Sequence, residues 1–166
     1  MAIREIRLFG DPVLNTAADP VEVFDERLHR LVGDMLEIMD AAGGVGLAAN
    51  QIGVTRRVFV FDCQGMRGHI VNPVWEPLGE AQQTATEGCL SVPGVRGEVT
   101  RHNTVIARGA DMHGRPLTLR GTGLLARCIQ HETDHLDGVM FTARMAPDQR
   151  KAALAAIDQA DWKKEN

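Results

Sequence analysis

The chain has 166 residues, of which 44% are hydrophobic and 24% charged, and its formal net charge is −4. This size and composition are typical of one soluble globular domain, expected here over residues 1–166, and the acidic balance gives no general reason to expect DNA or RNA as a partner. No stretch approaches the roughly 18 to 20 apolar residues of a membrane span, and the start lacks the apolar core of a secretory signal, so we expect a cytoplasmic protein.

The N-terminal part of the sequence predicts a strand, a turn and a helix. Ile3–Leu8 favours a short strand, and Gly10-Asp11-Pro12 favours a turn. Asp25 can cap a helix, because apolar residues follow it at helical spacing: Leu28, Leu31, Val32, Met35, Leu36 and Met39. Gly43 and Gly44 are expected to end this helix.

The middle of the chain has short β-branched runs broken by Gly, Pro and Asn, which is the pattern of strands and turns. The expected strands are Arg57–Phe61, His69–Trp75, Thr104–Ala107 and Pro116–Leu119. A hairpin turn is expected at Asp111–Arg115. The glycine-rich segment Gly43–Gly53 suits a loop packed against another backbone, or simply a tight connection from helix to strand.

Two helices are expected after the strands, one from about Thr122 to Asp137 and an Ala-rich one from Pro147 to about Lys163. Strands gathered in the middle and helices at the ends predict an α+β fold. In this fold, antiparallel or mixed sheets pack around the helix at 122–137, which is flanked by an N-terminal and a C-terminal helix.

The helix at the centre of this arrangement contains an HExxH sequence that starts at His131. At about 100° per residue, His131 and His135 lie on one side of the helix and can reach one ion, while Glu132 is placed to hold a water beside it. A solvated polar face is the alternative. Leu124 and Cys128 share the sector of the histidines, however, so these polar groups face the core and need a metal or hydrogen bonds. We therefore predict a metal site.

Two histidines are not enough, because a hydrolytic metal site has three protein ligands and an open position. The metzincin proteases place a third histidine six residues after the second, where this chain has Phe141. A thermolysin-like site needs a later glutamate, and Glu165 at the end of the chain is the only one. The protease patterns therefore lack a ligand.

A cysteine can supply the missing ligand. The three cysteines are an odd set without a signal peptide, so a disulfide framework is not expected. Cys128 lies about 7 Å along the helix from the midpoint of the two histidines. Its sulfur is therefore too far away to bind a metal ion held between them. Cys63 suits a small half-buried position near a strand end. Cys89 is the better candidate, because the neighbouring Gly88 permits close approach of the backbone.

Three segments resemble, in order and spacing, the three motifs of the bacterial-type peptide deformylases: GVGLAANQIG at 44–53, EGCLSVPG at 87–94 and QHETDHLDG at 130–138. The resemblance covers most of the chain. It implies removal of the N-formyl group from the N-terminal formyl-methionine of newly synthesised proteins, with release of formate. It also implies one divalent metal ion per chain, Fe²⁺ in the cell, which Zn²⁺, Ni²⁺ or Co²⁺ could replace.

The resemblance also implies roles for individual residues. The metal ligands would be Cys89, His131 and His135. Glu132 would take a proton from water and pass it to the leaving amine. Gln51 and the backbone amide of Leu90 would stabilise the oxyanion formed from the formyl group.

For the substrate, the resemblance implies an apolar pocket that takes the methionine side chain. Its walls would be Val45, Leu124, Cys128 and the His131 ring. Gly46 and Gly88 would let the peptide backbone pair beside them as an added strand, which reads main chain rather than sequence. Arg101 stands where the family often has an arginine near the substrate, with a strand-surface arginine as the alternative, and Glu87 could pair with an arginine.

Three residues depart from the common family pattern. Thr133 replaces a bulky apolar residue and is expected on the polar side of its helix, away from the chemistry. Asn50 is expected to change only the stiffness of its loop. Arg127 stands where an aliphatic residue often lines the pocket, and we expect its stem to pack while its head reaches water.

Other functions and partners stay open at this point. An HExxH metallopeptidase is one alternative, although Phe141 disfavours it. A non-catalytic metal-binding protein is another, although a structural site would need neither Glu132 nor Gln51. Basic residues of the last helix could make a weak contact with the ribosome, but a solvated helix face is the simpler interpretation: Arg150, Lys151, Lys163 and Lys164.

Overall fold

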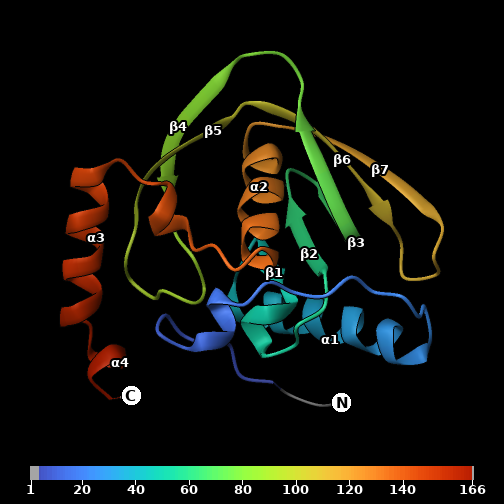
Figure 1. Ribbon diagram of the computed structural model, residues 1–166, viewed down its shortest axis with the longest axis horizontal. Helices are drawn as coiled ribbons and strands as arrows, with labels where there is room; N and C mark the ends of the chain where they lie inside the picture. Colours follow the sequence, from blue (N-terminus) through green and yellow to red (C-terminus); the bar gives the residue numbers. More distant parts are fainter. Residues whose placement is uncertain (1–3, 166) are drawn as a thin grey trace.

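Figure 1 shows a computed structural model that describes residues 4–165. The α+β prediction is confirmed: helix α2 (Leu124–Leu136) stands at the centre, with a five-stranded antiparallel sheet on one side and a two-stranded sheet on the other. The other long helices are α1 (Glu26–Ala42) and α3 (Pro147–Gln159). The strands are β1 (Gly46–Ala48), β2 (Val58–Cys63), β3 (Met66–Pro77), β4 (Gln82–Glu87), β5 (Gly97–His102), β6 (Thr104–Ala110) and β7 (Pro116–Thr122). Within residues 4–165, no helix is both long and apolar enough to cross a bilayer.

The larger sheet has the strand order β1-β2-β3-β6-β7 and is covered by a helix on each face. Side chains of a strand point alternately to opposite faces. In β2, Phe59 and Phe61 therefore join the core under α2, while Val58 and Val60 join the core under α1. Burial on both faces explains why β2 is an almost unbroken apolar run.

Helix α1 begins and ends as the sequence predicts. The Asp25 side chain accepts a hydrogen bond of 3.2 Å from the Leu28 amide, which satisfies a donor of the first turn. Gly43 ends the helix with a φ of +69°, a left-handed conformation that costs glycine little. The hairpin turn at Asp111–Arg115 is also confirmed, with the Asp111 side chain accepting hydrogen bonds from two amides of the turn.

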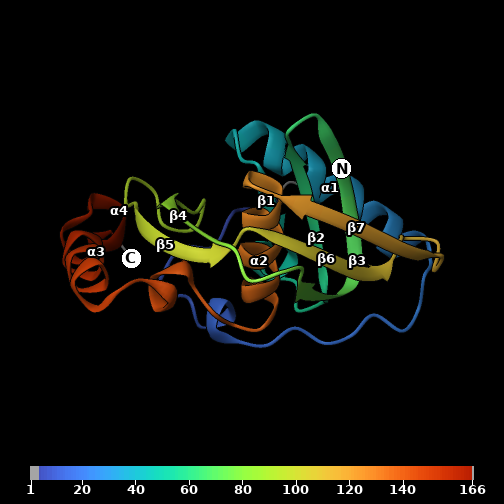
Figure 2. The same cartoon turned by 90° about the horizontal axis from the view of Figure 1, so that it is seen from above.

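The two-stranded sheet and α3 enclose a third core on the far side of α2 (Figure 2). It includes Val99 of β5, Phe141 and Met145 after α2, and Ile157 of α3. Cys89 packs against this core from the loop that follows β4. The third core thereby supports the loop that carries the candidate cysteine ligand.

The polar side of α2, on which Thr133 was expected, does not face solvent. Every residue from Leu125 to Leu136 is buried, because the second sheet covers the side that faces away from the first. Thr133 is one of these buried residues, and its hydroxyl donates a hydrogen bond of 2.7 Å to the Ile129 carbonyl. Its position away from the candidate ligands agrees with the sequence-based expectation.

Strands β1, β4 and β5 were not expected from the sequence. Strand β4 consists of Gln, Thr, Ala and Glu, with no apolar alternation, because most of its side chains are exposed or half-buried. Strand β1 has only three residues and pairs with β2 inside the glycine-rich segment. Neither β1 nor β4 has the periodicity on which a single-sequence prediction depends.

Both ends of the chain also differ from the prediction. Ile3 lies outside the described residues, and residues 4–8 form no strand; instead the Arg7 amide donates to the Gln51 carbonyl at 2.7 Å. The last helix breaks at Ala160, whose ψ of 139° is extended, before the short helix α4 (Asp161–Lys164). The break lets the Trp162 ring donate a hydrogen bond of 2.9 Å to the Pro93 carbonyl.

Candidate active site

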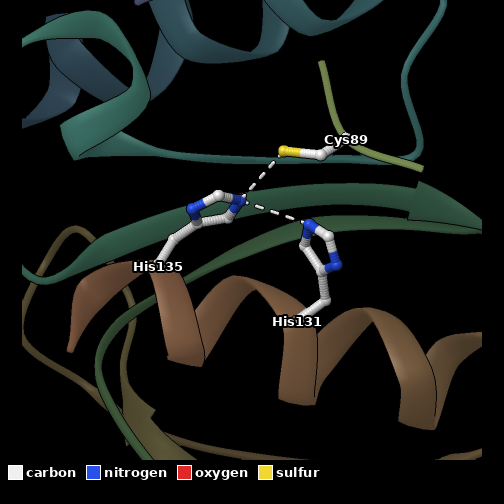
Figure 3. Close-up of side chains that lie close together, drawn as sticks. All are labelled: Cys89, His131 and His135. Atoms are coloured by element: carbon white, nitrogen blue, oxygen red, sulfur yellow. Dashed lines mark hydrogen bonds between the residues drawn. The ribbon is translucent and has the colours of Figure 1, made fainter. Parts of the chain in front are cut away.

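Cys89, His131 and His135 form a cluster that can hold a metal ion (Figure 3). The Nε2 atom of His135 lies 3.3 Å from the Cys89 sulfur and 3.2 Å from Nε2 of His131. Tetrahedral bonds of about 2.0 to 2.3 Å would place two ligand atoms about 3.3 to 3.7 Å apart, so the cluster fits one ion. Burial lowers the pKa of His135 well below its usual value, which leaves the ring neutral, as a ligand must be.

The other two cysteines lie outside this cluster, as predicted. The Cys128 thiol is buried and lies 3.7 Å from the Val45 carbonyl. Cys63 is buried at the end of β2. Neither joins the group of ligand atoms that His131 and His135 form with Cys89 among the described residues.

Glu87 contacts the Nδ1 atom of His131, on the opposite side of the ring from the Nε2 atom that lies near His135. The Nδ1 atom of His131 lies 2.8 Å from Glu87 Oε1, and Arg101 donates two hydrogen bonds to the same carboxylate, of 2.8 and 2.9 Å. Burial alone would raise the pKa of Glu87, but the hydrogen bonds from Arg101 and His131 outweigh it and hold that pKa well below its usual range. An ionised acceptor at Nδ1 leaves Nε2 free for a metal.

The structure corrects the expectations for two arginines. Arg127 does not reach water; its guanidinium is buried, contacts Glu87 and donates a 2.9 Å hydrogen bond to the Val99 carbonyl. Arg101 does not line the cavity described below. It is buried and bonds Asp134 at 2.7 Å in addition to Glu87. Both side chains are covered because the two-stranded sheet lies over this side of α2.

Glu132 lies beside the cluster, and one of its two carboxylate oxygens accepts no hydrogen bond among the described residues. Its Oε1 atom is 3.7 Å from His131 Nε2, and its buried Oε2 atom has no hydrogen-bond partner within residues 4–165. Burial raises the pKa of Glu132 to about 7. A carboxyl group with this pKa can both accept and release a proton near neutral pH.

Gln51 and Leu90 lie next to Cys89 of the cluster. The Gln51 side chain accepts a hydrogen bond of 2.9 Å from the Ala48 amide, and its Nε2 atom donates to Ser91 Oγ at 3.0 Å and to the Cys89 sulfur at 3.6 Å. The Leu90 amide donates no backbone hydrogen bond within residues 4–165. The contact of Gln51 with Ser91 was not predicted, because nothing in a single sequence pairs residues 40 positions apart.

A cavity of about 570 Å³ opens beside these groups. It is lined by most of the residues that the resemblance assigned to the site, namely Val45, Gly46, Gln51, Gly88, Cys89, Leu90, Leu124, Cys128, His131 and Glu132. Val45 and Leu124 are 46% and 44% exposed, so two apolar side chains stand open to solvent at its wall. Arg96 also lines the cavity and was not predicted. No charge or spacing pattern distinguishes it from the other arginines of the chain.

Gly46 allows β1 to lie directly against α2. A Cβ atom at this position would stand 2.8 Å from the Cys128 sulfur and 3.0 Å from Glu132 Cγ. We expect Gly46→Ala to lower the free energy of unfolding by about 1 to 3 kcal/mol through overpacking, and to lower kcat by displacing Glu132. Thermal unfolding measures the first effect, and an assay of the formate release that the resemblance implies measures the second.

A matched control is Gly33→Ala, since a Cβ atom in the middle of α1 meets nothing within 4 Å. This change should stabilise the protein by roughly 0.5 to 1 kcal/mol and leave kcat unchanged. Equal stability and activity of the two variants would contradict the proposed packing of β1 on α2.

Comparison with known proteins identifies the family. The family model described as polypeptide deformylase matches residues 3–151. The chain belongs to the polypeptide deformylase family. It is 59% identical over 166 residues to peptide deformylase 1 of Corynebacterium efficiens, covering 98% of each chain. It is 55% identical to a peptide deformylase of Acidothermus cellulolyticus, covering 98% of this chain and 89% of the relative.

Solved peptide deformylases share the fold. The structure from Thermus thermophilus aligns with a TM-score of 0.90 at 41% identity, covering 99% of this chain and 100% of the other. The structure from Synechococcus elongatus, in complex with actinonin, aligns with a TM-score of 0.88 at 37% identity, covering 96% and 90%.

Family membership decides between the functions left open by the sequence. As a peptide deformylase, the chain is an enzyme that removes the N-formyl group from nascent polypeptides, and the family is metal-dependent. The expected family and activity are confirmed. The metallopeptidase and the non-catalytic metal-binding protein are set aside.

Proposed function

We propose that Cys89, His131 and His135 hold a single divalent ion, Fe²⁺ in the cell, beside which the formyl group is hydrolysed. The approach of one sulfur and two ring nitrogens to within 4.8 Å carries this proposal. A cation held there would supply Lewis-acid chemistry, polarising the formyl carbonyl and making water more acidic. Thiolate and imidazole ligands also suit Zn²⁺, Ni²⁺ and Co²⁺, and the choice of iron comes from the family resemblance.

Glu132 is the proposed proton carrier. Its unused Oε2 atom can accept the proton of the attacking water, and the carboxyl group can then release that proton to the leaving amine nitrogen. Its pKa of about 7 supports both steps. Its Oε1 atom lies 3.7 Å from Nε2 of the proposed ligand His131, so the carboxyl group stands beside the proposed metal site.

Two hydrogen-bond donors are proposed to stabilise the oxyanion. Leu90 lines the cavity, and its backbone amide has no backbone acceptor within residues 4–165. The Gln51 side chain is held by Ala48 and Ser91, so its second N–H can turn from the Cys89 sulfur to a substrate oxygen. Donors fixed in advance cost little reorganisation during the reaction.

The cavity is proposed to bind the formyl-methionyl end of the nascent peptide. Val45, Leu124 and Cys128 offer an apolar wall for the methionine side chain, together with the His131 ring. Gly46 and Gly88 line the same cavity, where the absence of side chains would let the peptide backbone pair with the chain. Recognition through main chain would accept many sequences after the methionine.

Arg96 and Arg101 are expected to behave oppositely when substituted. Arg101 is buried between Glu87 and Asp134, so Arg101→Met leaves two buried carboxylates short of a partner and should cost roughly 3 to 5 kcal/mol of stability. Arg96 lines the cavity and makes no ion pair among the described residues. Arg96→Met should raise KM for a formyl-peptide and leave the melting temperature unchanged. A raised KM in a fully stable Arg101→Met enzyme would restore the substrate role first expected for Arg101.

The remaining expectations concern the whole chain. We propose that it works as one catalytic domain, because all three cores adjoin α2 or the loop that carries Cys89. Its location in the cytoplasm is also a proposal. Contact with the ribosome through the C-terminal basic residues stays a prediction.

Anaerobic purification followed by reloading with a chosen metal tests the proposed centre. With Fe²⁺, we expect about one ion per chain and rapid release of formate from a formyl-methionyl peptide, in proportion to the bound metal. Failure to release formate with Fe²⁺, Ni²⁺ and Co²⁺ alike would contradict the proposal.

A further inference from the structure

His135 lacks a partner for one of its two ring nitrogens. Its Nε2 atom faces the Cys89 sulfur and His131 Nε2, so this nitrogen points to the proposed metal (Figure 3). Its Nδ1 atom is buried and has no hydrogen-bond partner within residues 4–165. A neutral imidazole that offers Nε2 to a metal carries its proton on Nδ1. A buried N–H of this kind needs an acceptor.

The other histidine shows what such an acceptor does. His131 Nδ1 lies 2.8 Å from the buried Glu87 carboxylate, which fixes the ring and its tautomer. No carboxylate stands in hydrogen-bond contact with the His135 ring among the described residues. The two proposed ligands therefore differ in how their rings are held.

Asn50 is the neighbour with a matching unused acceptor. This side chain is fully buried, and its Nδ2 atom donates a hydrogen bond to the backbone carbonyl of His135. Its Oδ1 atom has no hydrogen-bond partner within residues 4–165. One unsatisfied donor and one unsatisfied acceptor thus lie on two residues that are already joined by a hydrogen bond.

We propose that Asn50 is the positioning residue of His135: its Nδ2 holds the His135 carbonyl, and its Oδ1 accepts the Nδ1 proton when Nε2 binds the metal. The inference rests on the proposed role of His135 as a ligand. Asn50 does not line the cavity, so it is placed to act on the proposed ligand rather than on the peptide. It therefore does more than stiffen its loop, the only role that the sequence indicated.

Metal retention distinguishes this role from simple support of the helix. Asn50→Leu removes both hydrogen bonds at similar volume. Arg57→Leu is the matched control, because Arg57 donates a 3.0 Å hydrogen bond to the next carbonyl, that of Leu136, and also holds Asp137. With the nickel-loaded enzyme and a chelator, we expect Asn50→Leu to lose metal about 10 to 100 times faster than the wild type, and Arg57→Leu at nearly the wild-type rate. Equal acceleration in both variants would overturn the proposal.

Nitrogen NMR of the zinc-loaded wild type, labelled at its histidine rings, needs no variant. The proposal predicts that the Nδ1 proton of His135 exchanges slowly and shows the shift of a hydrogen-bonded proton, as that of His131 should. An unprotonated or rapidly exchanging Nδ1 would overturn it. The Nε2 signals test the ligands separately: if His135 Nε2 does not respond to zinc, the ligand assignment fails first and the inference fails with it.

Discussion

A Glu132→Gln enzyme is expected to bind metal and peptide as the wild type does and to release formate about 10² to 10⁴ times more slowly. The glutamine fills the same space but cannot take a proton from water. The loss should fall on kcat rather than KM, because the carboxylate acts on the proton and not on the binding of the peptide. Steady-state formate release, together with metal analysis of the same samples, measures the effect.

The folding of this variant provides the internal control. Among residues 4–165, one buried oxygen of Glu132 has no hydrogen-bond partner, and neutralising a poorly paired buried charge should not weaken the fold. We therefore expect an unchanged or higher melting temperature for the metal-free variant. Full activity of Glu132→Gln would contradict the proton-carrier role, and a loss of bound metal would show that Glu132 acts as a ligand.

Cys89→Ala is expected to have the second large effect, a loss of metal affinity well above 100-fold and of activity with it. Removing a residue that hydrogen-bonds a metal ligand typically lowers the metal affinity about 10- to 100-fold. Removing the ligand itself should lower the affinity further. The two histidines that remain cannot form a three-ligand site within the described cluster. Equilibrium dialysis against Co²⁺, with the absorption spectrum of the bound ion, measures both affinity and ligand type.

The other cysteines serve as controls for this substitution. Cys63→Ser changes a buried thiol at the end of β2 and should leave the cobalt spectrum unchanged, although some stability is lost. Cys128→Ser changes the cavity wall and should alter KM without moving the spectrum. A spectrum that depends on Cys63 and not on Cys89 would reject the assigned ligand.

Apolar patterns in the sequence predicted the elements that bury many side chains in a core. Helix α1 and its Asp25 cap follow from the spacing of Leu28 to Met39, and β2 follows from an apolar run between turn residues. Strand β4 could not be predicted, because its side chains alternate between exposed and half-buried positions and carry no hydrophobic signal. The two-stranded sheet that β4 forms was therefore missed.

Missing that sheet explains the errors in the site. Without it, the polar sector of α2 appeared to face solvent, and Arg127 was expected to reach water; with it, Arg127 and Arg101 converge on Glu87. The cluster of Cys89, His131 and His135 was predictable, because HExxH places both histidines on one helix and the family motif points to Cys89. Contacts between distant segments, such as Asn50 with His135, depend on three-dimensional packing that no local pattern encodes.

The most direct test of the proposed centre is a crystal structure of the iron-loaded enzyme, with anomalous scattering recorded at the iron absorption edge. We predict one strong peak within bonding distance of the Cys89 sulfur and of Nε2 of both His131 and His135. A peak held by any other set of side chains, or an active iron-loaded enzyme without a peak at these three atoms, would contradict the account.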